Sequence, residues 1–362
     1  MRNIETDTSG GLTDFRSDNV TGVDPRIMEA IVAANAGTMT SYGDDEITAR
    51  VQARLAEVFE TEVWIFPVAT GTAANSLSLA SLTPSHGSVY CHREAHIEVD
   101  ECGAPEFFTG GAKLVLLGDD DGKFTASELE SKLATAHIGF QHAVQPSAVS
   151  VTQAAELGTI YTVDEIRAIG DVAKKYNLGY HMDGARFANA LVTLDCTAAE
   201  MTWKAGVDVL SFGATKNGAM AAEAVVFFRE ELAQNFLYRR KRAGHLFSKM
   251  RFLSAQLEAY LTDDLWLDNA RKSNGFASRL ATALKALPGG KLLAPVQANE
   301  IFVGLPEAVV EALEADGHLF YRWAADGDNV VIRLVTGFST DEAMVDTFIA
   351  AATNHSQRLV AG

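Results

Sequence analysis

Short apolar segments alternate with amphipathic ones over the central part of this chain, and this alternation constrains the fold more than any other feature. Each apolar segment has four to six residues, the length of a buried strand. The expected strands are residues 63–68, 88–91, 113–117, 148–153, 179–183, 207–212 and 223–228. Helical patterns separate most of them, which predicts an α/β fold with a mixed, mostly parallel sheet covered on both faces.

Helix-start signals support this alternation. Asp24 followed by Pro25 predicts an N-cap with a first-turn proline. Residues 125–128 (TASE) and 162–165 (TVDE) each have the spacing of a capping box. Helices are therefore expected to begin at all three places.

The pattern changes after the last of these strands. A long, basic-rich helical stretch is expected from Glu230, followed by a tail with strands near 300–303 and 330–335 and a final helix. The predicted organisation is an N-terminal segment (1–22), a large domain (23–260) and a small C-terminal α+β domain (261–362).

Charge and cysteine content exclude several classes of partner. The net charge of −17 is spread along the chain, which argues against binding to nucleic acid or an anionic membrane. No apolar run reaches the length of a membrane span, and the polar start does not resemble a signal or transit peptide. Cys91, Cys102 and Cys196 form no CxxC or zinc spacing, which predicts a reducing, cytoplasmic location.

The first polar turn that could carry chemistry is residues 69–75 (ATGTAAN), directly after a strand. A glycine between hydroxyl residues at a helix N-terminus offers free backbone N–H groups to a phosphate. An ordinary capped helix has the same composition, so both interpretations are open. Neither GxxxxGK[ST] nor GxGxxG is present, and this argues against a P-loop or a dinucleotide-binding turn.

The second candidate is Asp183, in residues 181–186 (HMDGAR) at a strand end. A buried carboxylate there suits a protonated heterocyclic nitrogen, because an unpaired buried charge is costly. The alternative is that Asp183 caps a helix and pairs with Arg186.

The third candidate is Lys216, between small residues after another strand. Partial burial lowers the pKa of an amine, as Schiff-base chemistry requires, although a single loop lysine is more often structural. A Gly-Thr turn, a strand-end Asp and a strand-end Lys, in that order, form the layout of fold-type I pyridoxal 5′-phosphate enzymes.

Further motifs resemble the low-specificity L-threonine aldolase family. They are residues 14–21 (DFRSDNVT), 41–45 (SYGDD), 181–186 with the trailing Asn189-Ala190, and 331–336 (VIRLVT). The motifs occur in order from residue 14 into the C-terminal domain. The resemblance implies a large domain with a mostly parallel sheet, a smaller α+β domain, and pyridoxal 5′-phosphate as the cofactor.

The resemblance also implies roles for individual residues. Lys216 would carry the cofactor, Asp183 would keep its ring nitrogen protonated, and His96 would stack on the ring. Gly71 and Thr72 would hold the phosphate.

Arginine suits carboxylates through its paired donors. The predicted substrate-binding residues are Ser17, Tyr42, His142, Arg186 and Arg333, and Arg186 is also counted among the cofactor-binding residues. His142 matches a second histidine near the substrate hydroxyl, but a structural role is equally open. Tyr42 would reach a neighbouring subunit's site, which implies a homo-oligomer, either a tetramer or a dimer.

No metal is expected. His92 and His96 are four residues apart and, if they lay on a helix, would face the same way, but HREAH is not the HExxH arrangement and a metal site would need further ligands.

Two segments depart from the family pattern. Residues 243–251 replace a glycine-rich stretch, leaving Lys249 or Arg251 as the possible basic residue, and residues 152–156 lack a histidine-containing run. Both put the side-chain preference in doubt.

The predicted function is cleavage of an L-β-hydroxy-α-amino acid, such as L-threonine, L-allo-threonine or L-phenylserine, to glycine and an aldehyde. His96 or His142 is the candidate base. The alternatives are β-elimination or transamination on the same framework, and a cofactor-binding protein without turnover.

Overall fold

The structure is a computed structural model that describes residues 13–118, 122–327 and 329–361. It divides into two compact units. One is Gly22–Ala270, and the other joins the described residues up to Thr21 with those from Arg271 onward. The predicted domain boundaries, after residues 22 and 260, stay predictions.

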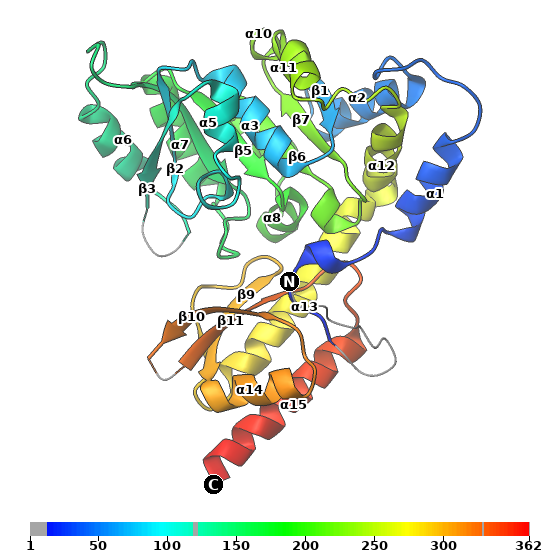
Figure 1. Ribbon diagram of the computed structural model, residues 1–362, viewed down its shortest axis with the longest axis vertical. Coiled ribbons are helices and arrows are strands. Elements are labelled where there is room, and N and C mark those ends of the chain that lie inside the picture. The colour runs from blue at the N-terminus through cyan, green and yellow to red at the C-terminus, as the bar shows by residue number, and fades with distance from the viewer. Residues whose placement is uncertain (1–12, 119–121, 328, 362) are drawn as a thin grey trace. The chain divides into compact units, whose positions relative to one another are not determined.

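A seven-stranded sheet forms the centre of the larger unit (Figure 1). Its order is β1-β7-β6-β5-β4-β2-β3, and only β7 runs antiparallel to its neighbours. The strands are β1 (Trp64–Val68), β2 (Gly87–His92), β3 (Lys113–Leu117), β4 (Gln145–Thr152), β5 (Gly179–Gly184), β6 (Val209–Gly213) and β7 (Glu223–Phe227). All seven predicted strands are confirmed, as is the mixed, mostly parallel sheet.

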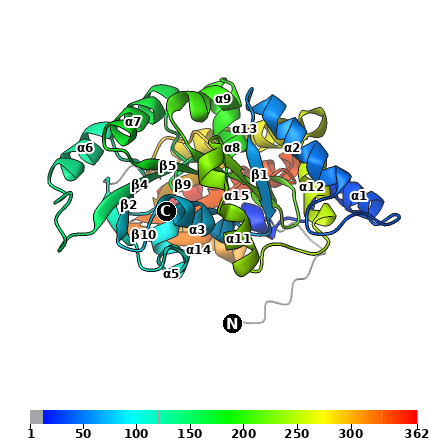
Figure 2. The ribbon, with the colours of Figure 1, turned by 90° about the horizontal axis from the view of Figure 1, so that it is seen from above.

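Helices cover both faces of this sheet, with α3 and α5 on one side and α6 and α7 on the other (Figure 2). The helices of this unit are α1 (Pro25–Ala34), α2 (Glu46–Val58), α3 (Gly71–Leu82), α4 (His96–Val99), α5 (Ala104–Thr109), α6 (Ala126–Ala134), α7 (Val163–Lys175), α8 (Phe187–Leu194), α9 (Ala198–Met201), α10 (Glu230–Ala233), α11 (Phe236–Arg242) and α12 (Arg251–Leu261). Helix α3 is buried along residues 73–80, so its alanine, serine and leucine side chains allow it to lie close against the strands.

The predicted helix starts are confirmed. Asp24 caps α1 with Pro25 in its first turn, and α6 and α7 begin with the two predicted capping boxes. A third box, Thr197 with Glu200, was not predicted.

The expected long basic helix is wrong. The chain forms the short helices α10 and α11, leaves regular structure over residues 243–250, and resumes with α12. Gly244 has a φ of +78°, a left-handed conformation that ends a helix and that glycine adopts without strain.

The second unit contains a four-stranded antiparallel sheet of order β10-β11-β9-β8. Its elements are β8 (Lys291–Leu292), β9 (Glu300–Pro306), α14 (Glu307–Ala315), β10 (Tyr321–Asp326), β11 (Asn329–Val335) and α15 (Glu342–Ala361), with α13 (Leu265–Lys285) entering from the larger unit. Strands β9 and β11 were predicted. Strand β10 was missed because its side chains are nearly all exposed, so its sequence has no buried period.

The core of this second unit is a single apolar cluster that includes Phe15, Ile332 and Phe348. Phe15 thus ties the start of the described chain to the C-terminal helix. No helix in the described part of the chain is long and apolar enough to cross a membrane.

Candidate active site

The carboxyl ends of β4, β5 and β6 meet at one edge of the large sheet. Asp183 on β5 lies in register with Thr152 on β4 and Ser211 on β6. Gly213 permits a close approach at this edge, because a Cβ there would lie 2.6 Å from the carbonyl oxygen of Ala185. Loops that leave these strands therefore bring their first residues together.

Asp183 is buried and accepts two hydrogen bonds. Its Oδ1 accepts from the backbone N–H of Ala185 at 2.9 Å, and its Oδ2 accepts from Nδ2 of Asn75 on α3 at 2.7 Å. Helix α8 begins at Phe187 with Arg186 at its N-cap position, so the alternative that Asp183 caps this helix is wrong. Arg186 is buried at the helix start.

His96 is the first residue of α4, and its side chain is partly exposed. Its Nδ1 lies 2.9 Å from Oε1 of Glu101, whose side chain is fully buried. The hydrogen bond to Glu101 raises the pKa of His96 above its ordinary value, despite the opposing effect of burial. Glu101 was not singled out in the sequence, because no local pattern links it to a histidine five residues earlier.

Glu156 supports the same histidine from the other direction. Its Oε1 accepts the backbone N–H of His96 at 3.0 Å and the hydroxyl of Thr152 at 2.7 Å. Burial raises the pKa of Glu156 to about 7. This carboxyl group stands in the 152–156 segment, which therefore contacts the backbone of His96.

Lys216 lies half-buried in a short 3-10 helix, Thr215–Asn217, directly after β6. Its Nζ has no hydrogen-bond partner among the described residues. Its charge acts on the pKa values of both His96 and Glu223, which places it near both. Glu223, buried on β7, accepts the backbone N–H of Ala214 at 2.8 Å, and burial raises its pKa to about 7.

The turn before α3 exposes backbone donors. Thr70 caps the helix by accepting the N–H of Ala73 at 3.2 Å, as the capped-helix interpretation requires. Within the described parts of the chain, the N–H groups of Gly71 and Thr72 have no acceptor. The same turn therefore also offers two donors at the positive end of the helix dipole.

Two side chains that the sequence analysis missed contact the chain just before α3, at Ala69 and at Pro67. His245 accepts the N–H of Ala69 at its Nδ1, at 3.3 Å, and burial lowers the pKa of this imidazole. Arg240 is buried against β1, with Nη1 3.4 Å from the carbonyl of Pro67 and its guanidinium over the ring of Phe66.

Arg240 forms no ion pair with any described residue, and its Nε is buried without a partner. Burial lowers its pKa to about 10, so it stays charged at neutral pH. Lys249 is exposed, and Arg251 faces the carbonyl of Gly37 instead.

Among the described residues, neither His142 nor Tyr42 forms a hydrogen bond or an ion pair with Asp183, His96 or Lys216. His142 is exposed, in the segment that precedes β4, at the opposite end of that strand from Thr152. Tyr42 has a φ of +62° and lies under the ammonium of Lys241, on the wall of a cavity of about 690 Å³ that Arg240 also lines. Their roles stay predictions.

Ser17 and Arg333 belong to the second unit. The hydroxyl of Ser17 caps a short 3-10 helix. Arg333 on β11 donates to Oε1 of Glu300 at 2.7 Å. Because Val335 donates to the carbonyl of Phe15, the segment with Ser17 runs beside the end of β11.

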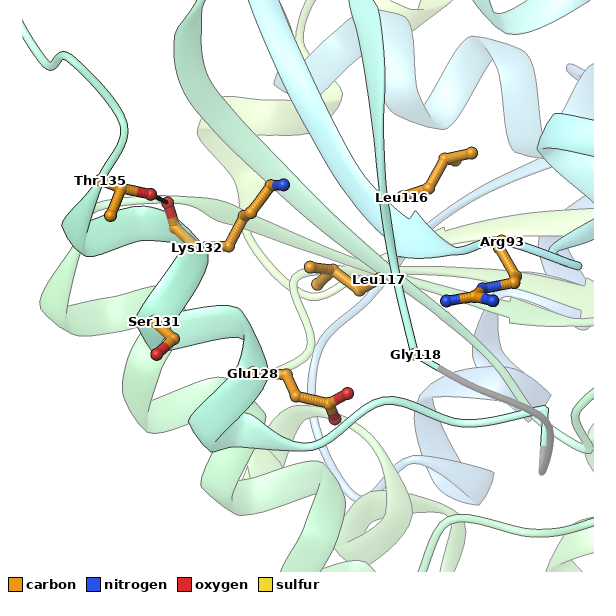
Figure 3. A pocket seen from close by; sticks show the side chains of 8 residues that line it. All are labelled: Arg93, Leu116, Leu117, Gly118, Glu128, Ser131, Lys132 and Thr135. Carbon is orange, nitrogen blue, oxygen red and sulfur yellow. Dashed lines mark hydrogen bonds between the residues drawn. The ribbon is translucent and has the colours of Figure 1, made fainter.

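The described residues form no metal site, but they do form further pockets. Residues 13–118, 122–327 and 329–361 contain no group of three His, Cys, Asp or Glu side chains suited to a metal. His92 ends β2 and His96 begins α4, so the two histidines do not share a helix face. Figure 3 shows a separate hollow of about 360 Å³ between β3 and α6, with Arg93, Glu128 and Lys132 on its walls.

Known proteins resemble this chain over most of its length. The family model for beta-eliminating lyases matches residues 14–308. A low specificity L-threonine aldolase from Pseudomonas sp. (strain NCIMB 10558) is 46% identical over 332 residues, which is 91% of this chain and 94% of that protein.

Solved structures agree with this match. A threonine aldolase from Leishmania major superimposes with a TM-score of 0.90 at 28% identity, covering 96% of this chain and 99% of that one. A serine palmitoyltransferase from Sphingomonas wittichii shares the fold, with a TM-score of 0.69 at 16% identity over 96% and 88% of the two chains. These neighbours are pyridoxal 5′-phosphate enzymes of fold type I, which confirms the predicted fold class.

Proposed function

The chain belongs to the low-specificity L-threonine aldolase family, a group of lyases, and from this premise we propose that it cleaves L-β-hydroxy-α-amino acids to glycine and an aldehyde. The observation that carries the proposal is the grouping of Asp183, His96 and Lys216 at one edge of the sheet. These three residues provide an anion, a base and an amine within one region.

We propose pyridoxal 5′-phosphate as the cofactor, because the donors and acceptors fit it at both ends. The free N–H groups of Gly71 and Thr72 and the unpaired guanidinium of Arg240 suit a phosphate. The buried carboxylate of Asp183 suits a protonated ring nitrogen. When bound through Lys216, the cofactor supplies an electron sink for the bond that breaks at Cα.

His96 is the base in this proposal. An ionised Glu101 can only accept hydrogen bonds, so the proton of a neutral His96 then lies on Nδ1, and Nε2 keeps its lone pair. That nitrogen can take the proton of the substrate's β-hydroxyl, directly or through a water. Arg186, buried at the start of α8, is the proposed partner of the α-carboxylate in this unit, while Ser17 and Arg333 stay predictions.

Product analysis tests this function. Purified protein loaded with the cofactor is given L-threonine, L-allo-threonine or L-phenylserine, and aldehyde, glycine, ammonia and keto acid are measured. Equal amounts of aldehyde and glycine are expected. Ammonia with a keto acid would instead assign the β-elimination that the family description names.

Three further parts of the proposal rest on the sequence alone. They are the side chain that the substrate carries, assembly as a homotetramer or a dimer, and a cytoplasmic location. The relative rates for the three substrates decide the first. Light scattering of the purified protein decides the second.

A further inference from the structure

The two buried carboxylates of the site share one hydrogen-bond donor. Nδ2 of Asn75 lies 2.7 Å from Oδ2 of Asp183 and 2.9 Å from Oε1 of Glu101. A side-chain amide nitrogen carries two protons, so both are used by these contacts. All three side chains are nearly inaccessible to solvent.

This arrangement matters because two neighbouring carboxylates tend to share one proton instead of both being charged. Burial raises the pKa of Glu101, and the charge of Asp183 raises it further. The hydrogen bonds from His96 and Asn75 act in the opposite direction, since they stabilise the anion. Asn75 is the contact that Glu101 and Asp183 have in common.

We propose that Asn75 is a positioning residue that keeps Asp183 and Glu101 charged side by side, and so couples the cofactor's ring-nitrogen partner to the His96 base. The assignment of these partners rests on the proposed function, whereas the bridge itself rests only on the hydrogen bonds. An anionic Glu101 sets the basicity of His96, and an anionic Asp183 holds the cofactor ring. Loss of the bridge therefore affects both ends together.

Histidine titration in the cofactor-free protein tests the link between Asn75, Glu101 and His96. The pKa of His96 is measured by NMR with labelled histidine, and its signal is assigned with His96→Gln. Without Asn75, Glu101 takes up a proton more readily, and its support of the imidazolium is weakened. In Asn75→Ala the pKa of His96 should fall by about one unit.

A matched control and a double-mutant cycle separate this effect from general damage. Ser76 is buried beside Asn75 on α3 and donates to Oε2 of Glu101 at 3.4 Å, but it has no recorded bond to Asp183. Ser76→Ala should shift the His96 pKa much less than Asn75→Ala. In a Glu101→Gln background, Asn75→Ala should have a much smaller effect on His96, because Asn75 can then act on the imidazole only through the charge of Asp183.

Other titratable groups face the same network and are unchanged in every variant. They are Lys216 after β6, Glu156 after β4, Glu223 on β7 and His181 on β5. Burial lowers the pKa of His181 to about 4, so it is neutral throughout the titration. Differences between variants therefore report on Asn75 and Glu101.

Cofactor affinity tests the link between Asn75 and Asp183. Fluorescence titration with pyridoxal 5′-phosphate should show binding about ten-fold weaker in Asn75→Ala, and less affected in Ser76→Ala. Asn75→Ser, which keeps one donor, provides a milder variant if the alanine protein does not fold.

An unchanged His96 pKa in a folded Asn75 variant would overturn the proposal. A shift of undiminished size in the Glu101→Gln background would overturn it as well. Failure to release an aldehyde would overturn the proposed function instead, and would leave the histidine titration intact as a measure of the bridge.

Discussion

The two ends of the candidate site are built in opposite ways. At the turn before α3, the N–H groups of Gly71 and Thr72 and the guanidinium of Arg240 have no anionic partner in the described chain. At the strand edge, Asp183 and Glu101 are already held by donors from the protein. In the proposed function a ligand would complete the first end, whereas the protein itself preorganises the second.

This difference indicates how the two ends contribute. A donor set without an acceptor gains most from an added anion, so the turn should dominate affinity. A preassembled acid–base network costs no rearrangement during reaction, so the strand edge should dominate turnover. Substitutions at the two ends should therefore separate KM and cofactor binding from kcat.

The largest effect is expected where the two ends meet, at Lys216. Lys216→Ala removes the amine that would bind the cofactor covalently and should lower kcat at least about 1,000-fold. The visible absorption of the bound cofactor should disappear as well. Full activity in this variant would mean that the site lies elsewhere.

Arg240 tests the open end. Arg240→Met keeps much of the apolar packing but removes the charge, and should weaken cofactor affinity about 10- to 100-fold with little change in kcat at saturation. The exposed Lys249 provides the control, since Lys249→Met should leave affinity within about two-fold. Fluorescence titration measures both. Equal effects would return Lys249 to consideration as the phosphate partner.

Glu223, which pairs with Gly213 at the end of β6, tests the strand edge through protein stability. Its pKa is about 7 in the folded protein against an ordinary 4.5, so folding favours its protonated form. Its contribution to stability is complete below pH about 4.5 and is lost as the pH rises through about 7. The glutamine in Glu223→Gln cannot ionise. Between pH 5 and pH 8 the free energy of unfolding of this variant should therefore rise, relative to that of the wild type, by up to about 3 kcal/mol.

Urea denaturation at the two pH values measures this gain. The same pH dependence in both proteins would show that Glu223 is not the titrating group. Glu156, whose pKa is also raised to about 7, would then be the next carboxyl to replace.

The smallest expected effect concerns the helix cap at the open end. Thr70→Ala removes the acceptor for the Ala73 N–H and should lower the free energy of unfolding by about 1 kcal/mol. Thr162→Ala removes a comparable cap from α7, away from the turn. Only Thr70→Ala should also weaken cofactor binding. Equal cofactor affinity in both variants would show that the cap at Thr70 does not contribute to phosphate binding.

Much of this arrangement could be predicted from the sequence. Apolar runs gave the seven central strands, and the polar residues that follow them gave Asp183, Lys216 and the turn at Gly71. These features are local, because strand, turn and helix start are adjacent in the chain.

The missed residues depend on contacts between distant segments. Asn75 meets Asp183 across 108 positions, and Arg240 reaches Pro67 across 173. Strand β10 was missed for a different reason, since its exposed side chains carry no periodic signal. Side-chain pairing of this kind follows from the tertiary fold and leaves no spacing pattern in the sequence.

The antiparallel strand β7 has a mechanical consequence for the lysine. Because β7 runs back along β6, the chain between Gly213 and Glu223 is a short tether fixed at both ends by paired strands. A short connection between fixed points leaves its backbone little freedom, so Lys216 moves mainly through its own side-chain torsions. If Lys216 binds the cofactor as proposed, its amine can move between bound and released positions while the backbone that carries it stays in place.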